Sequence, residues 1–459
     1  MLHQAVMRSA FPGWRTLFLF GEARHRRMAR MGDCVPALFA SKGRDPVVLS
    51  LAGMHLEALR VARPETDDRD EALAVARSLC RSGEVLSACL HAARVARRWP
   101  DQLHRLVNFA VCASPDAALP LLSAHPAQTA ALWYRYGDFP RAAAALQHCS
   151  AGEIDHLLLS SAIDRRLGRV QRADEAVERA FLQQGLRPVK LAPAVRGLPE
   201  IVCAPHASPC GGAPLVSVVM PVCNVADYIE QAVNSVLQQD HRNLEVIVVD
   251  DASTDGTGSR VEAAFSHDPR IQVLRLPVQQ GTYTARNRGM AVARGEFITF
   301  HDGDDWSHPE KISLQLRAVR SSPRIQASVS DWVRVCREGC FHARQVYPYA
   351  RMNTSSLMMR RQVLSRLGWF DNVAIGADSE YLARIKLVFG VSAVARVRKV
   401  LSLGSWRADS LTNAPATGFS SRHAVHSRLQ YWERWNRWHT LMYGEGKFSP
   451  LPLQSNIPL

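Results

Sequence analysis

Two stretches of sequence decide the fold: residues 244–251 read LEVIVVDD and residues 297–305 read FITFHDGDD. Each is a run of apolar, largely β-branched residues that ends in aspartates, as is typical of a buried strand in a parallel sheet. The carboxyl ends of such strands meet at one edge, where open α/β sheets bind ligands. We therefore expect several carboxylates to share one edge, suited to a divalent cation and a phosphorylated ligand. These carboxylates belong to Asp250, Asp251, Asp302 and Asp304.

Strand and helix patterns alternate around these stretches. The expected strands are 215–222, 244–249, 271–276 and 296–300, and helical spacing is found at 227–239, around 261–265 and at 284–294. Repeated strand, helix, strand units predict an α/β fold with a Rossmann-like, mostly parallel sheet.

A nucleotide is the favoured ligand for this edge. The region contains neither GxxxxGK[ST] nor a strand-linked GxGxxG, which argues against ordinary phosphoryl or hydride transfer. The remaining common chemistry for a nucleotide diphosphate with a metal is displacement of the diphosphate from a sugar. There the metal neutralises the charge that develops on the leaving group.

Residues 214–257 and 281–311 resemble the opening half of a family 2 glycosyltransferase with the GT-A fold, and the likeness extends to about residue 407. The resemblance implies an inverting nucleotide-diphospho-sugar transferase that uses Mn²⁺ or Mg²⁺. It implies nucleotide contacts at Pro221, Asp250 and Asp251. In the DxD segment it implies Asp304 as a direct metal ligand and Asp302 as a ribose or metal contact, with Asp305 either a ligand or its support.

Residues 367–385, LGWFDNVAIGADSEYLARI, resemble the family segment whose acidic residue deprotonates the acceptor hydroxyl. The resemblance implies Asp378 as this base, ahead of Glu380. Many members have Glu-Asp where this chain has Ala377-Asp378, and the missing carboxylate removes one cause of a raised pKa. The implied reaction is a single displacement with inversion.

Two arginines are candidates for the donor site. Arg286, in the ARNRG block with Arg288, could neutralise the diphosphate, whereas the alternative is an ordinary solvated arginine. Arg407, in SWRADSLT, is similar to a basic position beside the donor site in related bacterial enzymes, and a structural ion pair is the alternative.

Composition limits the classes of partner. The chain has 459 residues, a net charge of +14 and no apolar stretch near the 18 to 20 residues that span a bilayer. Its ten cysteines show no paired zinc spacing, which predicts free thiols in a reducing cytoplasm. No nucleic-acid-binding motif accompanies the charge, so we expect no nucleic acid partner. Peripheral association with an anionic membrane, to which residues 11–20 could contribute, is the alternative to a merely solvated basic surface.

The predicted domains are an N-terminal segment (1–48), an all-α, TPR-like domain (49–190), a proline- and glycine-rich linker (191–213), the GT-A domain (214–412) and a C-terminal helical extension (413–459). The helical domain either docks a protein partner or glycan, as solenoids do, or simply packs. The tryptophan stripe at 432, 435 and 438 predicts helix packing.

We expect a cytoplasmic bacterial glycosyltransferase that moves a sugar, by default from a UDP-sugar, to a glycan or lipid-linked acceptor in surface polysaccharide synthesis. The alternative is a catalytically silent glycan- or nucleotide-binding protein whose helical domain is an interaction scaffold. Retention of both aspartate pairs and of the ADSEY carboxylates argues against this alternative.

Overall fold

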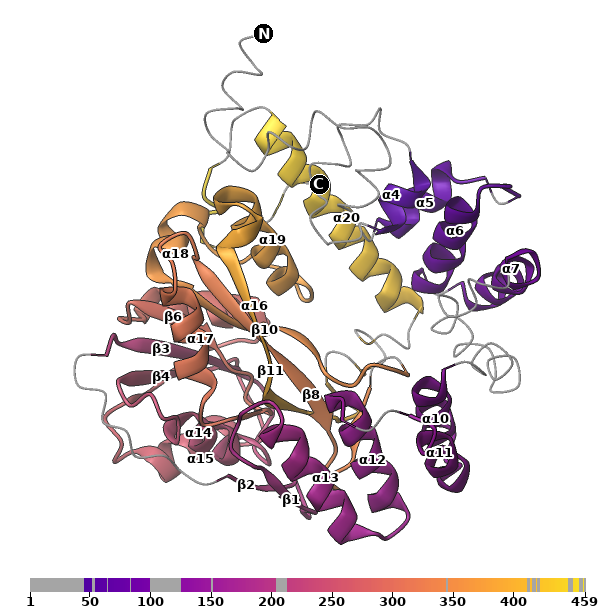
Figure 1. Cartoon of the computed structure of the whole chain (residues 1–459). Coiled ribbons are helices and arrows are strands. Elements are labelled where there is room, and N and C mark those ends of the chain that lie inside the picture. Colours follow the sequence, from indigo (N-terminus) through magenta and orange to yellow (C-terminus); the bar gives the residue numbers. More distant parts are fainter. Residues whose placement is uncertain are drawn as a thin grey trace. The chain divides into compact units, whose positions relative to one another are not determined.

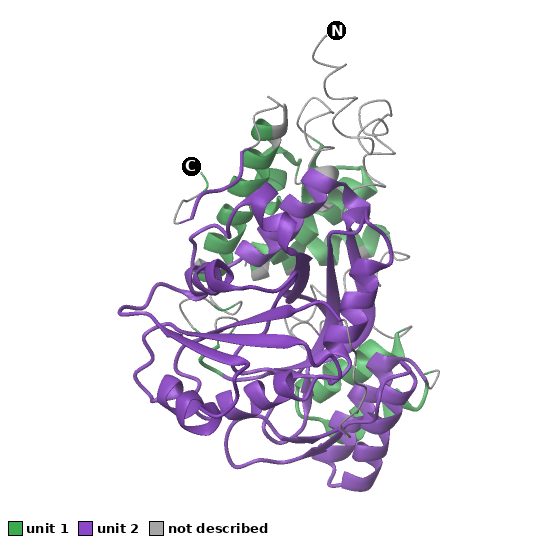
Figure 2. Ribbon diagram, turned by 90° about the vertical axis from the view of Figure 1, so that its left-hand side faces the viewer, with its two compact units in different colours: residues 1–149, 408–448, 457–459 green, residues 150–407, 449–456 purple. Residues whose placement is uncertain are grey.

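In the computed structural model the chain forms two compact units (Figure 2). One comprises residues 1–149, 408–448 and 457–459, and the other comprises residues 150–407 and 449–456. The described residues are 45–51, 54–63, 65–82, 84–99, 125–149, 152–203, 213–343, 346–410, 413–414, 418, 422–444, 449–453 and 457. The predicted segment 11–20 lies outside them.

The second unit contains a nine-stranded sheet in the order β5-β4-β3-β6-β10-β8-β11-β7, with β9 paired to β8. Figure 1 labels β3, β4, β6, β8, β10 and β11 of this sheet. Strands β3 to β6 are mutually parallel, while β10 runs antiparallel to both β6 and β8. The α/β fold class is thus confirmed, with a mixed second half. The strands are β3 (Val216–Val222), β4 (Leu244–Asp250), β5 (Ile271–Arg275), β6 (Phe297–Phe300), β7 (Trp306–Ser307), β8 (Ala327–Val335), β9 (Phe341–His342), β10 (Arg351–Arg360) and β11 (Val394–Ser405).

Helices cover both faces of the parallel strands. Alternate residues of β3 and β4 form one buried core with α14 (Ile229–Leu237), α15 (Thr257–Phe265) and α17 (Lys311–Arg320). The opposite face carries α16 (Thr282–Val292), whose Gly289 lies so close to the sheet that an added Cβ would be 2.4 Å from Val219 Cγ1. The unit also contains α18 (Arg361–Leu367), α19 (Ala377–Phe389) and the short 3₁₀ helix η3 (Val391–Ala393).

A helix pair preceding the sheet belongs to the same unit: α12 (Ile154–Arg166) and α13 (Val170–Leu182). Asp155 Oδ1 accepts the backbone N–H groups of Tyr349 and Ala350, both at 2.7 Å. Because one carboxylate oxygen caps two amides of a loop almost 200 residues away, α12 fixes the chain that leads into β10.

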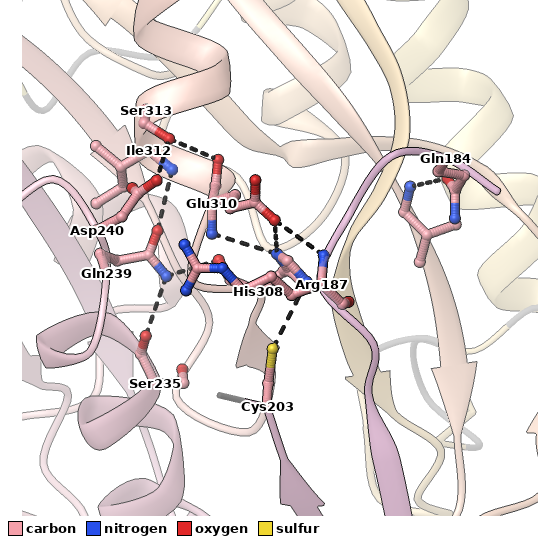
Figure 3. Close-up of polar contacts among 11 residues, drawn as sticks. Gln184, Arg187, Cys203, Ser235, Gln239, Asp240, His308, Glu310, Ile312 and Ser313 are labelled. Atoms are coloured by element: carbon pink, nitrogen blue, oxygen red, sulfur yellow. Dashed lines mark hydrogen bonds and ion pairs between the residues drawn. The ribbon is translucent and has the colours of Figure 1, made fainter. Parts of the chain in front are cut away.

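The predicted linker contains a small antiparallel sheet, β1 (Lys190–Ala192) with β2 (Glu200–Val202). Figure 3 shows how residues before β1 join the nine-stranded sheet: Glu310 Oε2 accepts Arg187 N–H at 3.1 Å, and Gln184 Oε1 accepts Val400 N–H at 2.7 Å. His308 contacts both Glu310 and Arg187. Its Nδ1 accepts the Glu310 N–H, and its Nε2 lies 3.2 Å from Arg187 O. The described part of the predicted linker is thus tied to the sheet through residues that precede β1, and the linker stays a prediction for residues 204–212.

The described residues of the first unit form mainly helices, while the bounds 49–190 of the helical domain and its similarity to tetratricopeptide repeats stay predictions. Glu433 of α20 accepts the backbone N–H groups of Leu56 and Glu57 at the start of α5, at 2.8 and 3.1 Å. Trp435 of the predicted stripe is 1% exposed. The helices are α4 (Pro46–Leu51), α5 (His55–Val61), α6 (Arg69–Arg81), α7 (Val85–Arg98), α10 (Pro126–Arg135), α11 (Phe139–Leu146) and α20 (Arg422–Gly444).

Across the described parts of both units, no helix combines the length and apolar character needed to cross a membrane. The free thiols among the described side chains are those of Cys80, Cys149, Cys203, Cys223, Cys336 and Cys340. Burial raises the pKa of the Cys203 thiol to about 11, so this thiol is protonated at neutral pH.

Candidate functional site

The carboxyl ends of β3 and β4 form the first half of the candidate site. Pro221 is buried near the end of β3, paired with Val249 of β4. Asp250 Oδ1 accepts Ser253 N–H at 3.0 Å. Asp251 accepts the N–H groups of residues 280 and 281 at 2.7 Å each, one on each carboxylate oxygen. Asp251 thus anchors the loop that leads into α16, a contact that the sequence did not indicate.

The DGDD loop after β6 lies directly against the end of β3. An added Cβ at Gly303 would be 2.5 Å from Val222 Cγ1, so only glycine allows this approach. A turn closes the loop through Asp305 N–H to Asp302 O at 3.2 Å. His301 Nε2 lies 3.1 Å from Asp305 O, in keeping with a loop-shaping role.

Asp302 is paired with a buried cation. Arg286 Nη2 lies 2.6 Å from Asp302 Oδ1, and the Arg286 residue is 2% exposed. Burial by itself would raise the pKa of Asp302, but the Arg286 charge and hydrogen bonds outweigh it and hold the pKa below its ordinary value. The guanidinium also packs over the rings of Tyr283 and Phe300, and its Nε has no hydrogen-bond partner among the described residues.

Asp304 is paired with the second candidate arginine. Arg407 Nε donates to Asp304 Oδ2 at 2.9 Å, and Ser405 Oγ donates to the same oxygen at 2.8 Å. Both side chains of this ion pair are partly exposed, at 17% and 18%. The Arg407 guanidinium lies over the Tyr228 ring at 5.5 Å. Arg286 and Arg407 thus each neutralise one aspartate of the DxD segment.

Asp305 is buried, with 5% of its surface exposed. Its Oδ1 accepts Ser405 N–H at 3.2 Å. Burial, and then the negative charges of Asp304 and Asp302, raise the pKa of Asp305 well above its ordinary value. Nearby Lys311 has its pKa lowered to about 8 by burial, which the charges of Asp305 and Asp302 partly oppose.

The donor chemistry of this loop fits a hard divalent cation, because mutually repelling carboxylates favour Mg²⁺ or Mn²⁺. Asp302 and Asp304 both have partly exposed side chains, at 28% and 17%, and Asp304 is the direct ligand that the family resemblance implies. No described group of three or more His, Cys, Asp or Glu side chains is arranged to hold a metal by itself. A cation bound here would therefore need further oxygen ligands from a bound phosphorylated molecule. Metal binding by Asp302, Asp304 and Asp305 stays a prediction.

Asp378 lies in the first turn of α19, after Gly376 with φ of +89°. Tyr283 OH donates to Asp378 Oδ1 at 3.0 Å, and the Thr354 hydroxyl donates to Oδ2. Burial and the Asp378 charge raise the pKa of Tyr283, so the phenol stays protonated and serves as a donor. Since Tyr283 also packs on Arg286, one side chain joins Asp378 to the Arg286–Asp302 pair.

Glu380 is placed differently from Asp378. Its side chain is fully buried, and both oxygens bind Arg384 at 2.6 and 2.8 Å within α19. Arg384 in turn donates to the carbonyl oxygens of Leu367 and Trp369. Glu380 therefore contributes to the core around α19, and the structure does not bring it to the edge that carries Asp378.

Sequence reasoning missed several polar residues of the site. Arg286 Nη2 also donates to Ser355 Oγ at 3.2 Å, and Thr354 and Ser405 contact Asp378 and Asp304. The pairing register of β10 shifts between Asn353 and Met358, so its polar residues leave regular sheet geometry there. The polar run NTSS within an apolar strand was the available signal.

The chain is similar to known proteins mainly in the region that contains this site. The family model described as Glycosyl transferase family 2 matches residues 217–373. TuaG, a Bacillus subtilis glycosyltransferase named for teichuronic acid biosynthesis, is 44% identical over 103 residues, 22% of this chain and 41% of TuaG. WcaA of Escherichia coli, named for colanic acid biosynthesis, is 37% identical over 103 residues, 22% of this chain and 37% of WcaA. The chain thus spans about two fifths of these relatives.

Solved structures give more distant matches. S. aureus TarS 1-349 in complex with UDP-GlcNAc is 18% identical, covers 48% of this chain and 72% of that one, and has a TM-score of 0.35. Glucosyl-3-phosphoglycerate synthase from Mycobacterium tuberculosis, with Mn²⁺ and UDP, is 20% identical, covers 51% and 81%, and has a TM-score of 0.33.

Proposed function

We propose that this chain, a member of glycosyl transferase family 2 through residues 217–373, transfers a sugar from a nucleotide diphosphate to an acceptor hydroxyl. The donor we propose is a UDP-sugar and the acceptor a glycan or lipid-linked glycan. The reaction is a single displacement with inversion at the anomeric carbon.

One observation carries this proposal: a carboxylate that can accept a proton and a cation paired with the DxD segment are joined through a single side chain. Asp378 accepts from Tyr283, Tyr283 packs on Arg286, and Arg286 pairs with Asp302 of the DxD segment. Displacement of a diphosphate by an alcohol requires these two functions at opposite sides of one anomeric carbon.

Asp378 would act as the base. The hydroxyls of Tyr283 and Thr354 occupy one position on each of its oxygens, and a carboxylate has about four acceptor positions in all. Positions therefore remain for an acceptor hydroxyl. Because a phenol with a raised pKa stays protonated, Tyr283 would not compete with Asp378 for the acceptor proton.

Arg286 and Arg407 would balance charge on the donor side. Each is now paired with an aspartate, and each would remain close to a diphosphate bound beside that aspartate. A divalent cation held by Asp304, with Asp302 as a further oxygen donor, would supply charge neutralisation to the leaving group. Asp305 would hold the loop through Ser405 rather than face the ligand.

The cellular role that we propose is bacterial surface polysaccharide synthesis. Support comes from the names of two relatives, TuaG for teichuronic acid and WcaA for colanic acid. We also propose that the enzyme works in the cytoplasm at the membrane face, since a net charge of +14 would attract anionic lipids and lipid-linked acceptors.

The test is UDP release from UDP-glucose, UDP-galactose, UDP-GlcNAc and UDP-GalNAc with Mn²⁺ and a panel of glycan and lipid-linked glycan acceptors. NMR reads the anomeric configuration of the glycosylated product. Asp378→Asn should lose turnover by about 10²- to 10⁴-fold and keep UDP binding. Glu262→Gln, an exposed carboxylate paired with Arg275, is the matched control and should keep native turnover. Native protein that binds UDP with Mn²⁺ yet turns over no donor would favour the silent binding protein.

A further inference from the structure

We propose that Tyr283 and Thr354 are positioning residues that hold the Asp378 carboxylate from both sides and aim it at the acceptor hydroxyl. This inference rests on the proposed function, because it assigns to these two hydroxyls the orientation of the proposed base.

Tyr283 has no rotational freedom in its hydrogen bonding. Its oxygen accepts the Gly376 N–H at 3.0 Å, and its single proton goes to Asp378 Oδ1 at 3.0 Å. The residue is 7% exposed, and its ring packs against Phe370 at 5.8 Å and under Arg286. A phenol has one proton to donate, so the accepted N–H fixes the direction of that donation. Tyr283 is thereby hydrogen-bonded both to the backbone at the start of α19 and to the Asp378 carboxylate within that helix.

Thr354 holds the other oxygen. Its hydroxyl donates to Asp378 Oδ2 from the irregular stretch of β10, where the register with β8 shifts. Because Tyr283 comes from α16 and Thr354 from β10, the two donors approach from two separate elements. A carboxylate held at both oxygens cannot rotate about its Cβ–Cγ bond without losing one donor. The oxygen positions left over are thus fixed in space, as a proton acceptor requires.

Tyr283 also places this carboxylate relative to the donor side. Its ring faces the Arg286 guanidinium at 5.6 Å, and Arg286 is paired with Asp302. The distance between the base and the DxD segment is therefore set by packed side chains rather than by a free loop. Displacement in line needs a fixed spacing of this kind.

The test compares Tyr283→Phe with a matched control, Tyr381→Phe. Tyr381 is also buried and packed on Phe370, but its hydroxyl donates to Gly368 O at 2.9 Å and does not touch Asp378. We expect Tyr283→Phe to lower kcat about 10- to 100-fold, the loss of one hydrogen bond to a charged group, with donor KM unchanged. Tyr381→Phe should leave kcat native.

Two further variants separate positioning from general packing. Thr354→Val should lower kcat in the same way, and Thr354→Ser should restore it, since serine retains the donor. The double variant Tyr283→Phe with Asp378→Asn should turn over no more slowly than Asp378→Asn alone, because Tyr283 acts only through that carboxylate.

A readout independent of turnover comes from thermal unfolding. When Tyr283→Phe and Asp378→Asn are combined in one protein, the change in Tm should differ from the sum of the two single changes. When Tyr381→Phe and Asp378→Asn are combined, the change in Tm should equal that sum. Additive effects for the first pair, or a native kcat for Tyr283→Phe, would overturn the proposal. Native protein without any turnover would refute the proposed function instead, and the positioning role would fall with it.

Discussion

Arg407 Nε donates to Asp304 Oδ2 over 2.9 Å, so the aspartate that we propose as the direct metal ligand already has a cationic partner. Arg407 and a divalent cation would compete for one carboxylate oxygen. When a nucleotide diphosphate is present, the same arginine gains a second anionic partner. The ion pair is therefore compatible with both interpretations of Arg407 that the sequence left open.

Removing Arg407 should change metal binding in the absence of nucleotide. We expect Arg407→Ala to bind Mn²⁺ more tightly, by roughly 2- to 5-fold, because a partly exposed ion pair contributes up to about 1 kcal/mol. Binding of UDP with Mn²⁺ should instead weaken. Electron paramagnetic resonance of free Mn²⁺ measures the first quantity and calorimetry the second. Arg396→Ala removes a similar ion pair with Asp331 and is the control. Weaker Mn²⁺ binding without nucleotide would contradict the competition.

The two acidic candidates in α19 should fail in different ways. Asp378→Asn is expected to abolish transfer while Tm stays within a few degrees of native. Glu380→Gln should lower the free energy of unfolding by about 3–5 kcal/mol, because it leaves the fully buried Arg384 without its charged partner. Urea denaturation and UDP release measure the two effects. A stable Glu380→Gln protein without activity would reverse the assignment of base and structural residue.

His308 should make stability fall in mild acid. Burial lowers its pKa from 6.5 to about 4, although its contact with Arg187 O opposes the shift. Because the pKa of His308 is lower in the folded than in the unfolded state, neutral His308 contributes to the free energy of unfolding. This contribution is fully present above about pH 6.5 and is lost as the pH falls towards 4. The free energy of unfolding that is lost is on the order of 3 kcal/mol.

The matched variant is His308→Asn, whose amide oxygen can still accept the Glu310 N–H. Its free energy of unfolding should fall less between pH 7 and 4.5 than that of the native protein. His267→Gln, at an exposed histidine, should retain the native slope. Equal slopes for His308→Asn and native protein would show that His308 is protonated at no cost.

Close packing of α16 should make Gly289 sensitive to any side chain. Gly289→Ala would place a Cβ 2.4 Å from Val219 Cγ1, and we expect a loss of about 1–3 kcal/mol in unfolding free energy. Adding Val219→Ala should recover part of this loss by removing the clashing methyl groups. Chemical denaturation of both single variants and the double variant measures the coupling. A Gly289→Ala protein of native stability would contradict the close approach.

The fold was largely predictable because its signals are local. Each β-branched run that ends in aspartate marks a strand and its carboxyl end, as β4 and β6 confirm. Contacts between distant residues were not predictable. Nothing in the ADSEY spacing shows that Glu380 turns into the core towards Arg384 while Asp378 turns towards Tyr283, because both lie in the first turn of one helix. The proline- and glycine-rich stretch near residue 200 likewise gave no sign of the β1 and β2 pairing.

The most direct test of the central claim is the thermal stability of native protein with UDP, in the presence and absence of Mn²⁺. A ligand that binds only the folded state at 100 times its Kd adds about 2.7 kcal/mol of stability. We predict a rise in Tm with UDP and Mn²⁺ together that is lost in Asp304→Asn and retained in Asp378→Asn. No rise for native protein with UDP and Mn²⁺, or an equal rise in Asp304→Asn, would contradict a metal-assisted nucleotide-sugar site at this edge of the sheet.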